Sequence, residues 1–324
     1  MKPTCTSDLL IIGGGPAGLS AAINGASEGL TVRLLDAGHV LGGQAKESSG
    51  IENYPGFPDG ITGDDLMGRM ARQARKFAAS VIAPVSAVGL VKNADGSVTV
   101  QTDDFGEYTS RSVLLSMGLS YRRLPADNIG HFIGRGVFYG VPTWVIGKST
   151  RTVAVVGGAN SAGQAALGLA RGGRLDVKLL VRSSLEKGMS TYLIDRIRQT
   201  DNIEVIETCD VQACGGTTCL QTITITHAGL QRAIPVDAMY IFIGAAPRTH
   251  WLRGCIALDE NNFVLTGEAT SYRMGHDGSP PAFYETSMAG VFAAGDVRSG
   301  STKRIATSIG EGAGALQMIH KYLA

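Results

Sequence analysis

Three glycines at fixed spacing are the first residues of the chain whose pattern predicts chemistry. Residues 9–12 have the length and branching of a buried parallel strand, and Gly13, Gly15 and Gly18 follow them directly. Apolar residues then recur at the spacing of a helix. In such a unit, one glycine allows a tight turn, one lets the backbone approach a pyrophosphate, and one lets helix and strand pack closely. Phosphates bind free N–H groups at the positive end of the helix dipole, so the pattern predicts a dinucleotide site.

An acidic residue stands where the ribose of that dinucleotide needs a hydrogen-bond acceptor. A second apolar run over residues 30–35 ends at Asp36, about 20 residues beyond the glycines. Glycines alone are a weak signal, whereas a strand, turn, helix, second strand and acid in one unit are a specific one. The sequence therefore predicts that residues 8–36 bind a dinucleotide.

The same pattern begins again in the middle of the chain. Residues 153–156 form an apolar run, and Gly157, Ala159 and Ala162 occupy the positions of the three glycines. Because Ala159 stands where a glycine is usual, we expect the backbone to approach a pyrophosphate less closely. The next predicted strand is followed by Arg182 instead of an acid, which favours a 2′-phosphate and thus NADP(H) over NAD(H). A degenerate site that binds little is the alternative.

The remaining pattern predicts the elements that hold these two units. Short alternating runs over residues 85–111 and 203–234 predict two antiparallel β-meanders. Each is followed by a buried strand that ends in a glycine, at Gly118 and Gly244. We therefore expect an α/β fold with two Rossmann-like dinucleotide-binding domains, each with an appended antiparallel β-meander. Two dinucleotides side by side imply that one passes a hydride to the other.

The last third of the chain returns to the first domain. Residues 290–296 predict a strand that ends in a turn and an acid, and a helical pattern follows over residues 305–322. The order of the motifs predicts a discontinuous first domain, residues 1–117 and 246–324, and an inserted second domain, residues 118–245.

Charge and hydropathy limit the classes of partner. Lysine and arginine total 29 and acids 28, a net charge of +1, so no strong field attracts nucleic acid or an anionic membrane. No apolar run reaches membrane-spanning length, and the polar N-terminus does not read as a signal peptide. We expect a soluble cytoplasmic protein with no nucleic-acid or membrane partner.

The five cysteines form no C-x-x-C pair. Cys209, Cys214 and Cys219 are each separated by four residues, which matches no standard zinc or iron–sulfur spacing. We expect no metal site and interpret these cysteines as ordinary buried or turn residues. Whether they approach one another in space is left open.

Several segments in this order resemble the low-molecular-weight thioredoxin reductases, and together they cover nearly the whole chain. They read GGGPAG, GGQ, IENYPGFPDGITG, VVGGANSA and AAGDVRSGSTKRIATSIGEG. The resemblance implies a flavoprotein that binds FAD and NADPH or NADH and forms a homodimer. It implies FAD contacts from Gly13, Gly15, Pro16, Ala17, Gly18, Asp36, Gly43, Gln44, Asn53, Gly295, Asp296, Lys303, Arg304 and Ile305. It implies nicotinamide dinucleotide contacts from Gly157, Ala159, Asn160, Ser161, Ala162 and Arg182.

The chain departs from this family at the redox cysteines. The family carries a C-x-x-C pair shortly before the second glycine motif, and the matching positions here hold Gly140 and Thr143. Neither side chain forms a thiolate or exchanges with a disulfide. We therefore name no catalytic residue, and we do not expect the usual reduction of thioredoxin through an internal dithiol. The segment KRIATSIGEG also resembles the ferredoxin or flavodoxin–NADP reductases, which lack the pair too.

The sequence thus predicts an FAD-dependent oxidoreductase that passes electrons from NAD(P)H through FAD to an external acceptor. Ferredoxin, flavodoxin, a quinone-like molecule, oxygen and a disulfide protein are the acceptors considered. The alternative is an FAD-binding protein with a degenerate nicotinamide site, either reduced by a protein donor such as ferredoxin or given a non-redox role. A third hypothesis is a structural protein with an unused nucleotide-binding fold, and the cofactor motifs at both ends of the chain disfavour it. The choice between NADPH and NADH and any rotation of the domains are left open.

Overall fold

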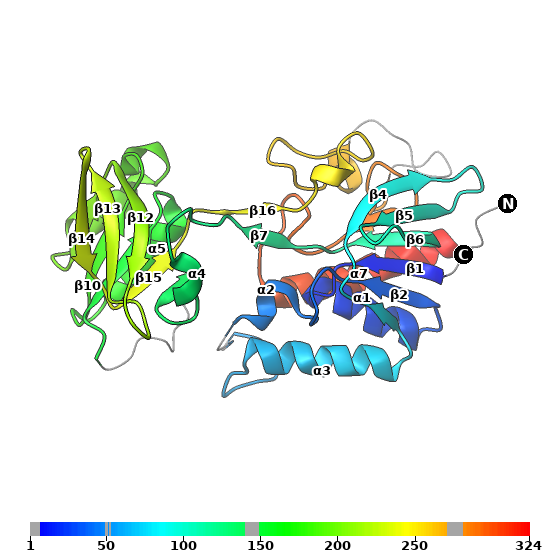
Figure 1. The fold of residues 1–324 in the computed structure, drawn as a ribbon. Coiled ribbons are helices and arrows are strands. Elements are labelled where there is room, and N and C mark those ends of the chain that lie inside the picture. Colours follow the sequence, from blue (N-terminus) through cyan, green and yellow to red (C-terminus); the bar gives the residue numbers. More distant parts are fainter. Residues whose placement is uncertain (1–6, 49–50, 52, 140–148, 271–280) are drawn as a thin grey trace. The chain divides into compact units, whose positions relative to one another are not determined.

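The computed structural model describes residues 7–48, 51, 53–139, 149–270 and 281–324 (Figure 1). The chain divides into two compact units, Met1–Ser120 with Ala246–Ala324 and Tyr121–Ala245. It passes between them in β7 (Leu119–Tyr121) and β16 (Ala245–Pro247), which pair as a two-stranded sheet.

A seven-stranded sheet forms the centre of the first unit. Its strands are β1 (Ser7–Ile12), β2 (Val32–Leu35), β3 (Ser80–Ile82), β4 (Ala87–Lys92), β5 (Val98–Thr102), β6 (Glu107–Leu115) and β17 (Val291–Ala293). Their order is β3-β2-β1-β6-β5-β4, with β17 also paired to β6. β4, β5 and β6 form the predicted antiparallel meander, and the other strands are parallel. The predicted meander and the predicted buried strand after it share the long strand β6, which pairs with β5 near its start and with β1 and β17 toward its end.

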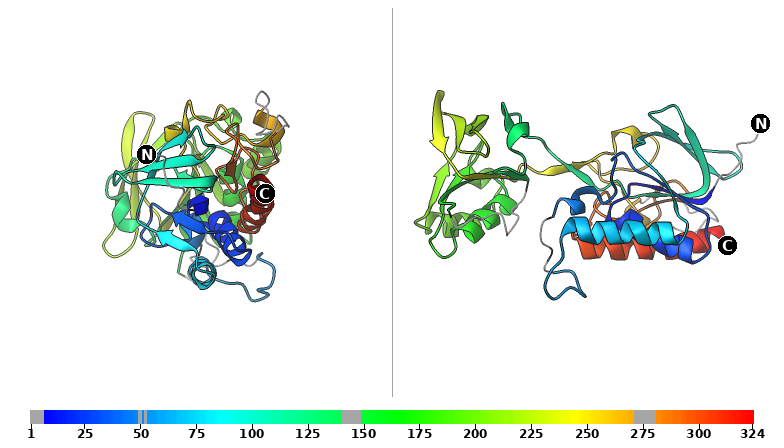
Figure 2. Two further views of the ribbon diagram at one scale, coloured as in Figure 1. Left: turned by 90° about the vertical axis from the view of Figure 1, so that its right-hand side faces the viewer. Right: turned by 60° about the horizontal axis from the view of Figure 1, so that its bottom comes forward.

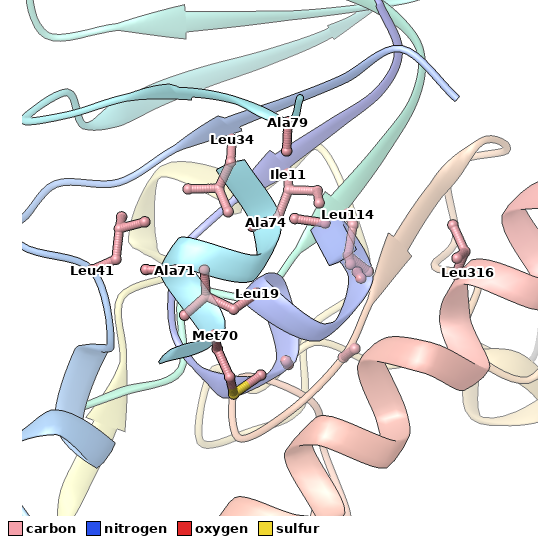
Figure 3. Packing of buried hydrophobic residues seen from close by; sticks show 14 of the residues in the cluster. Ile11, Leu19, Leu34, Leu41, Met70, Ala71, Ala74, Ala79, Leu114 and Leu316 are labelled. Atoms are coloured by element: carbon pink, nitrogen blue, oxygen red, sulfur yellow. The ribbon is translucent and has the colours of Figure 1, made fainter. Parts of the chain in front are cut away.

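Successive residues of β1 point to opposite faces of this sheet, and both faces are covered. The helices of the unit are α1 (Pro16–Ser27), α2 (Gly43–Lys46), α3 (Gly63–Lys76) and α7 (Ile305–Leu323), with short 3-10 helices at His250–Leu252 and Gly267–Thr270. Leu9 and Ile11 pack with α1, α3 and α7 on one face. Figure 3 shows Ile11 in this cluster. Leu10 and Ile12 pack with the meander on the other. Figure 2 shows α3 and α7 on the same side of the sheet.

Helix α3 follows directly from its sequence. The Oγ1 atom of Thr62 accepts a hydrogen bond from the N–H of Asp65 (3.1 Å) and so caps the first turn. Acids occupy that turn and basic residues the last, which complements the helix dipole. No helix in the described part of the chain is long and apolar enough to cross a membrane.

The second unit repeats this arrangement with a five-stranded parallel sheet in the order β11-β10-β9-β15-β8. These strands are β8 (Val137–Tyr139), β9 (Thr152–Val156), β10 (Asp176–Leu180), β11 (Ile203–Ile206) and β15 (Ala238–Ile241), and the meander is β12 (Cys209–Gly215), β13 (Thr222–His227) and β14 (Leu230–Pro235). The helices are α4 (Ile129–Phe132), α5 (Asn160–Ala170) and α6 (Thr191–Arg198), with a 3-10 helix at Leu185–Lys187. Val153 and Val155 of β9 pack under α5 and α6, while Ala154 and Val156 pack under the meander. The predicted fold class is thereby confirmed.

One predicted boundary is wrong. The second meander was expected to begin at Ile203, but Ile203–Ile206 is β11, which pairs in parallel with β10. Helix α6 connects these two strands, and a strand that returns through a helical crossover joins the same sheet in parallel. The meander therefore begins only at Cys209.

The cysteines of β12 belong to the core of the second unit. Cys209 and Cys214 are buried, and burial raises the pKa of each thiol to about 11. Thiols with such pKa values form little thiolate at neutral pH. Cys219 is exposed and Cys255 half-buried, and all four are unpaired thiols.

A single buried hydroxyl stands out in the parallel sheet of the second unit. Tyr240 lies fully buried on β15, stacked on Phe138 with ring centroids 5.7 Å apart. No described residue hydrogen-bonds to its hydroxyl, and burial raises the pKa of this group to about 12. A buried polar group without a partner costs free energy of folding.

We therefore expect Tyr240→Phe to raise the free energy of unfolding by about 1 kcal/mol, because it removes an unpaired hydroxyl and keeps the ring. Urea denaturation followed by circular dichroism measures this change. Tyr240→Ala is the control and should lose about 3–5 kcal/mol through the cavity it leaves. A loss of more than about 1 kcal/mol in Tyr240→Phe would show that the hydroxyl has a partner after all.

Candidate dinucleotide sites

The turn after β1 is shaped by two glycines that leave no room for a side chain. Gly13 has a φ of +104°, and a Cβ there would lie 2.5 Å from the carbonyl oxygen of Ser116. A Cβ on Gly18 would lie only 1.9 Å from the carbonyl oxygen of Gly13. The hydroxyl of Ser116 donates to that same oxygen (2.8 Å). These glycines are therefore required by the tight turn and by the close packing of α1 on the strand.

Gly15 is different, because the described residues leave open the space that a side chain there would enter. It is the N-cap of α1, and a Cβ there would meet no described atom within 4 Å. Pro16 begins the helix and Ala17 follows it, buried. Within the described structure no side chain caps this helix, and its first turn carries no acid. Free N–H groups at the positive end of the dipole and open space beside Gly15 fit a pyrophosphate.

Asp36 lies beside this turn and also holds it in shape. Its Oδ2 accepts from the N–H of Gly14 (2.6 Å) and its Oδ1 from the N–H of Gly38 (2.7 Å). An ionised carboxylate has lone pairs beyond these two, so a ribose hydroxyl can still donate to it. The structural part of this role was not predicted from the sequence.

The segment before α2 forms another wall next to the glycine turn. The N–H of Gly42 donates to the carbonyl oxygen of Gly14 (2.8 Å), and a Cβ on Gly43 would lie 3.5 Å from the Cα of Gly15. Gln44 is exposed at the start of α2. Asn53 is exposed in the following loop, and no described bond ties its side chain to the turn.

The turn after β17 meets α1 and α7 at the same place. Gly295 has a φ of +77°, and a Cβ there would lie 3.0 Å from the Cβ of Ala17. The Oδ1 atom of Asp296 accepts from the hydroxyls of Ser308 (3.1 Å) and Ser301 (3.4 Å). Burial raises the pKa of this carboxyl above its usual range, against the lowering effect of these two hydrogen bonds. Segments that are far apart in the sequence thus form one site in the first unit.

The predicted run from Lys303 to Ile305 lies at the start of α7. Lys303 has a φ of +54° and places its ammonium 4.8 Å from the centroid of the Phe263 ring. Arg304 is the exposed N-cap, whose carbonyl oxygen accepts from the N–H of Ser308 (2.9 Å), and Ile305 is the first helical residue. The run is thus joined to Asp296 through Ser308.

Two residues of this site were not predicted, Arg298 and Glu311. The buried carboxylate of Glu311 accepts from the N–H of Gly295 (2.7 Å) and from Nη2 of Arg298 (2.8 Å). Glu311 is the one charged residue in the stretch 305–319, and this was the available signal, because a buried charge requires partners.

The turn after β9 follows the same backbone path as the turn after β1, with fewer glycines. Gly157 has a φ of +150°, and a Cβ there would lie 2.5 Å from the carbonyl oxygen of Phe242. Ala159 is the N-cap of α5 with φ −110° and ψ 175°, an extended conformation open to any residue. Ala162 is fully buried, so its methyl group fits where the first unit admits only glycine. This turn therefore does not depend on the close helix–strand packing seen at Gly18.

The side chain of Asn160 is bound to α6. Its Nδ2 donates to the hydroxyl of Ser190 (3.0 Å), and its Oδ1 accepts from the N–H of Ser190 (2.8 Å). Ser190 is the N-cap of α6, so this pair joins the glycine turn to that helix. Ser161 and Arg182 are exposed. Positions 140 and 143, where the family carries its cysteines, lie outside the described residues.

Comparison with known proteins agrees with this geometry. Residues 7–312 match the family model described as Pyridine nucleotide-disulphide oxidoreductase. The chain belongs to this family. A thioredoxin reductase of Eremothecium gossypii is 32% identical to this oxidoreductase over 328 residues, with 97% of each chain covered. A bifunctional thioredoxin reductase/thioredoxin of Mycobacterium leprae is 32% identical and covers 98% of this chain, which spans 66% of that protein.

A solved structure extends the likeness to three dimensions. The thioredoxin reductase of Streptococcus pyogenes superposes on this oxidoreductase with a TM-score of 0.78 and 28% identity, and 98% of each chain is covered. The chain is therefore a thioredoxin reductase-like, FAD- and NAD(P)-binding flavoprotein, and the family predicted from the motifs is confirmed. The open space at Gly15 and the uncapped start of α1 fit the FAD of this family.

The different roles of Gly15 and Gly18 can be separated by substitution. Gly15→Ser keeps a good N-cap residue, so the cofactor-free protein should stay within about 0.5 kcal/mol of the wild type. Its side chain enters the space open to the cofactor, and FAD affinity should fall at least about tenfold. Gly18→Ala should instead destabilise the protein by about 1–3 kcal/mol through overpacking. Flavin fluorescence titration and urea denaturation measure the two effects.

Gly168→Ser is the matched control, because a Cβ at Gly168 in α5 also meets nothing within 4 Å. It should change neither FAD affinity nor stability appreciably. Wild-type FAD affinity in Gly15→Ser would contradict the assignment of the open space to the cofactor.

Proposed function

We propose that this chain passes electrons from a reduced nicotinamide dinucleotide through FAD to an external acceptor, without an internal dithiol. The observation that carries the proposal is the combination of a built FAD turn, open at Gly15, with a sequence that contains no C-x-x-C pair. Bound FAD supplies the redox chemistry, and the protein supplies binding, orientation and electrostatics.

Different residues of the first unit bind different parts of FAD. The first-turn N–H groups of α1 bind the pyrophosphate, and Asp36 accepts from ribose hydroxyls. Asp296 is a half-buried carboxylate with its remaining lone pairs open to a second hydroxyl donor. Gly43 lies beside Gly15, and Gln44 follows it in α2. Supporting this division, Asp36 and Gly43 lie at the glycine turn, and Gly295, which precedes Asp296, lies against Ala17 at the start of α1.

The second unit is proposed to hold NADPH in preference to NADH. Arg182 is exposed two residues after the end of β10, in the region where an acid would select the ribose 2′-hydroxyl of NADH. A guanidinium at this position pairs with a 2′-phosphate. The side chain of Asn160, through its hydrogen bonds to Ser190, is proposed to fix the turn between Gly157 and Ala162.

The electron acceptor is proposed to be a separate redox protein. Gly140 and Thr143 cannot carry electrons, and the buried thiols of Cys209 and Cys214 do not replace them, because their pKa of about 11 keeps them protonated. Among relatives, one is a thioredoxin reductase fused to thioredoxin, and another, 27% identical, is a 34.2 kDa protein in a rubredoxin operon of Clostridium pasteurianum. These names favour a small redox protein as the partner, and we propose ferredoxin, flavodoxin and a disulfide protein as its candidates.

The proposal predicts rapid anaerobic bleaching of the flavin by NADPH, measured by stopped-flow absorbance. Arg182→Gln should raise the NADPH concentration needed for half-maximal rate about tenfold, because one charge-assisted pair with the 2′-phosphate is lost. The same variant should react with NADH at the wild-type rate. Arg196→Gln, which removes a charge from α6, is the matched control and should leave both nucleotides unaffected.

Failure of both nucleotides to bleach the FAD-loaded protein would overturn the proposed electron entry. Reduction by a ferredoxin in place of NADPH would then support the alternative in which the second glycine motif is degenerate.

A further inference from the structure

Glu311 is a buried acid on α7 that accepts hydrogen bonds from the turn after β17. Only 6% of its side chain is exposed, and its two oxygens accept three hydrogen bonds. Oε2 accepts from the N–H of Gly295 (2.7 Å) and from Nε of Arg298 (3.2 Å), and Oε1 accepts from Nη2 of Arg298 (2.8 Å). This one carboxylate therefore accepts hydrogen bonds from both the first and the last residue of the four-residue turn from Gly295 to Arg298.

This turn has little freedom to adopt another shape. The N–H of Arg298 donates to the carbonyl oxygen of Gly295 (3.0 Å) and closes the turn. Gly295 has a positive φ and would place a Cβ 3.0 Å from that of Ala17, so it lies directly against the start of α1. The turn is thus held between α1 and α7, and Glu311 provides its anchor on α7.

The carboxylate of Glu311 is paired with the guanidinium of Arg298, which is itself held in place. The guanidinium lies 5.4 Å from the ring centroid of Phe283 and 5.5 Å from that of Tyr284, and 13% of the side chain is exposed. A buried carboxylate is stable only when it is paired and hydrogen-bonded. A charged acceptor also forms stronger hydrogen bonds than a neutral one, so the pair strengthens the bond to the N–H of Gly295.

Asp296 lies in the turn between Gly295 and Arg298, the two residues that donate hydrogen bonds to Glu311. Its carboxylate accepts from the hydroxyl of Ser308, which precedes Glu311 by three residues and so shares its face of α7. On this helix face, Glu311 therefore holds the turn on either side of Asp296, and Ser308 holds the Asp296 carboxylate itself. A shift of Glu311 would therefore move the Asp296 carboxylate.

We propose that Glu311 is a positioning residue for the flavin site, which fixes the Asp296 carboxylate through the Gly295 amide and Arg298. This inference rests on the proposed function, because it requires FAD to bind at Asp296. Glu311 acts only through these residues and does not touch the cofactor.

Glu285 supplies a matched control for Glu311. It is also a buried glutamate that binds a glycine amide, with Oε1 accepting from the N–H of Gly290 (3.1 Å) and Oε2 from that of Ala282 (3.2 Å). Gly290 directly precedes β17, whereas Gly295 follows it at the end that carries Asp296. Glu285→Gln and Glu311→Gln thus remove the same charge at opposite ends of one strand.

The test measures three quantities on the full-length wild type and both variants: the FAD dissociation constant, the flavin midpoint potential and the melting temperature without cofactor. Glu311→Gln should raise the dissociation constant about tenfold or more and shift the potential. Glu285→Gln should lower the melting temperature while leaving both flavin quantities at wild-type values. Glu311→Asp keeps the charge but shortens the reach by one methylene, and it should weaken FAD binding with less loss of stability.

Equal effects of the two glutamine variants on FAD affinity would overturn the proposal, since Glu311 would then be merely structural. Wild-type affinity and potential in Glu311→Asp would also overturn it. A wild-type protein that does not bind FAD would remove the proposed function and this inference together, whereas FAD binding that is unchanged in the Glu311 variants would remove this inference alone.

Discussion

The close approach of α1 to the end of β1 is the constraint on which the first unit depends. A side chain at Gly18 would lie 1.9 Å from the carbonyl oxygen of Gly13, so the helix can start here only with glycine. The same helix start packs against α7, where a Cβ on Gly312 would lie 2.2 Å from the carbonyl oxygen of Ala17. Because α1 is fixed on both sides, its free N–H groups point to one place. Asp36, which follows β2, is bonded to the turn before this helix start, and Gly295, which follows β17, lies against Ala17.

The two units show how one topology can hold two dinucleotides with different demands on the backbone. In the first unit, Gly15 leaves open space and Gly18 brings helix and strand together. In the second, Ala159 and Ala162 fill those positions, and the side chain of Asn160 ties the turn to α6. A turn fixed by side-chain hydrogen bonds does not need the close packing that forces glycine. The second site is therefore proposed to depend more on exposed groups such as Arg182 than on backbone contact.

The parts of this structure that could be predicted from the sequence are those with a local cause. Strands such as β1, buried on both faces, read as continuous apolar runs, and the glycine turns follow from their spacing. The strand Ile203–Ile206 was assigned to the wrong sheet, because a short alternating run does not reveal its partner and α6 before it has only three buried residues. Glu311 and its Gly295 amide were missed because they meet through tertiary packing of α7 on the turn after β17, which no local pattern encodes.

An anaerobic reductive titration of the FAD-loaded protein tests most directly whether electrons pass without an internal dithiol. Each addition of NADPH or dithionite is followed by flavin absorbance, and free thiols are counted before and after reduction. If FAD accepts two electrons with no dithiol beside it, a single two-electron equivalent per flavin completes the bleaching and the thiol count does not change. Uptake of a second equivalent with the appearance of new thiols would contradict the proposed route and reveal a disulfide in electron transfer.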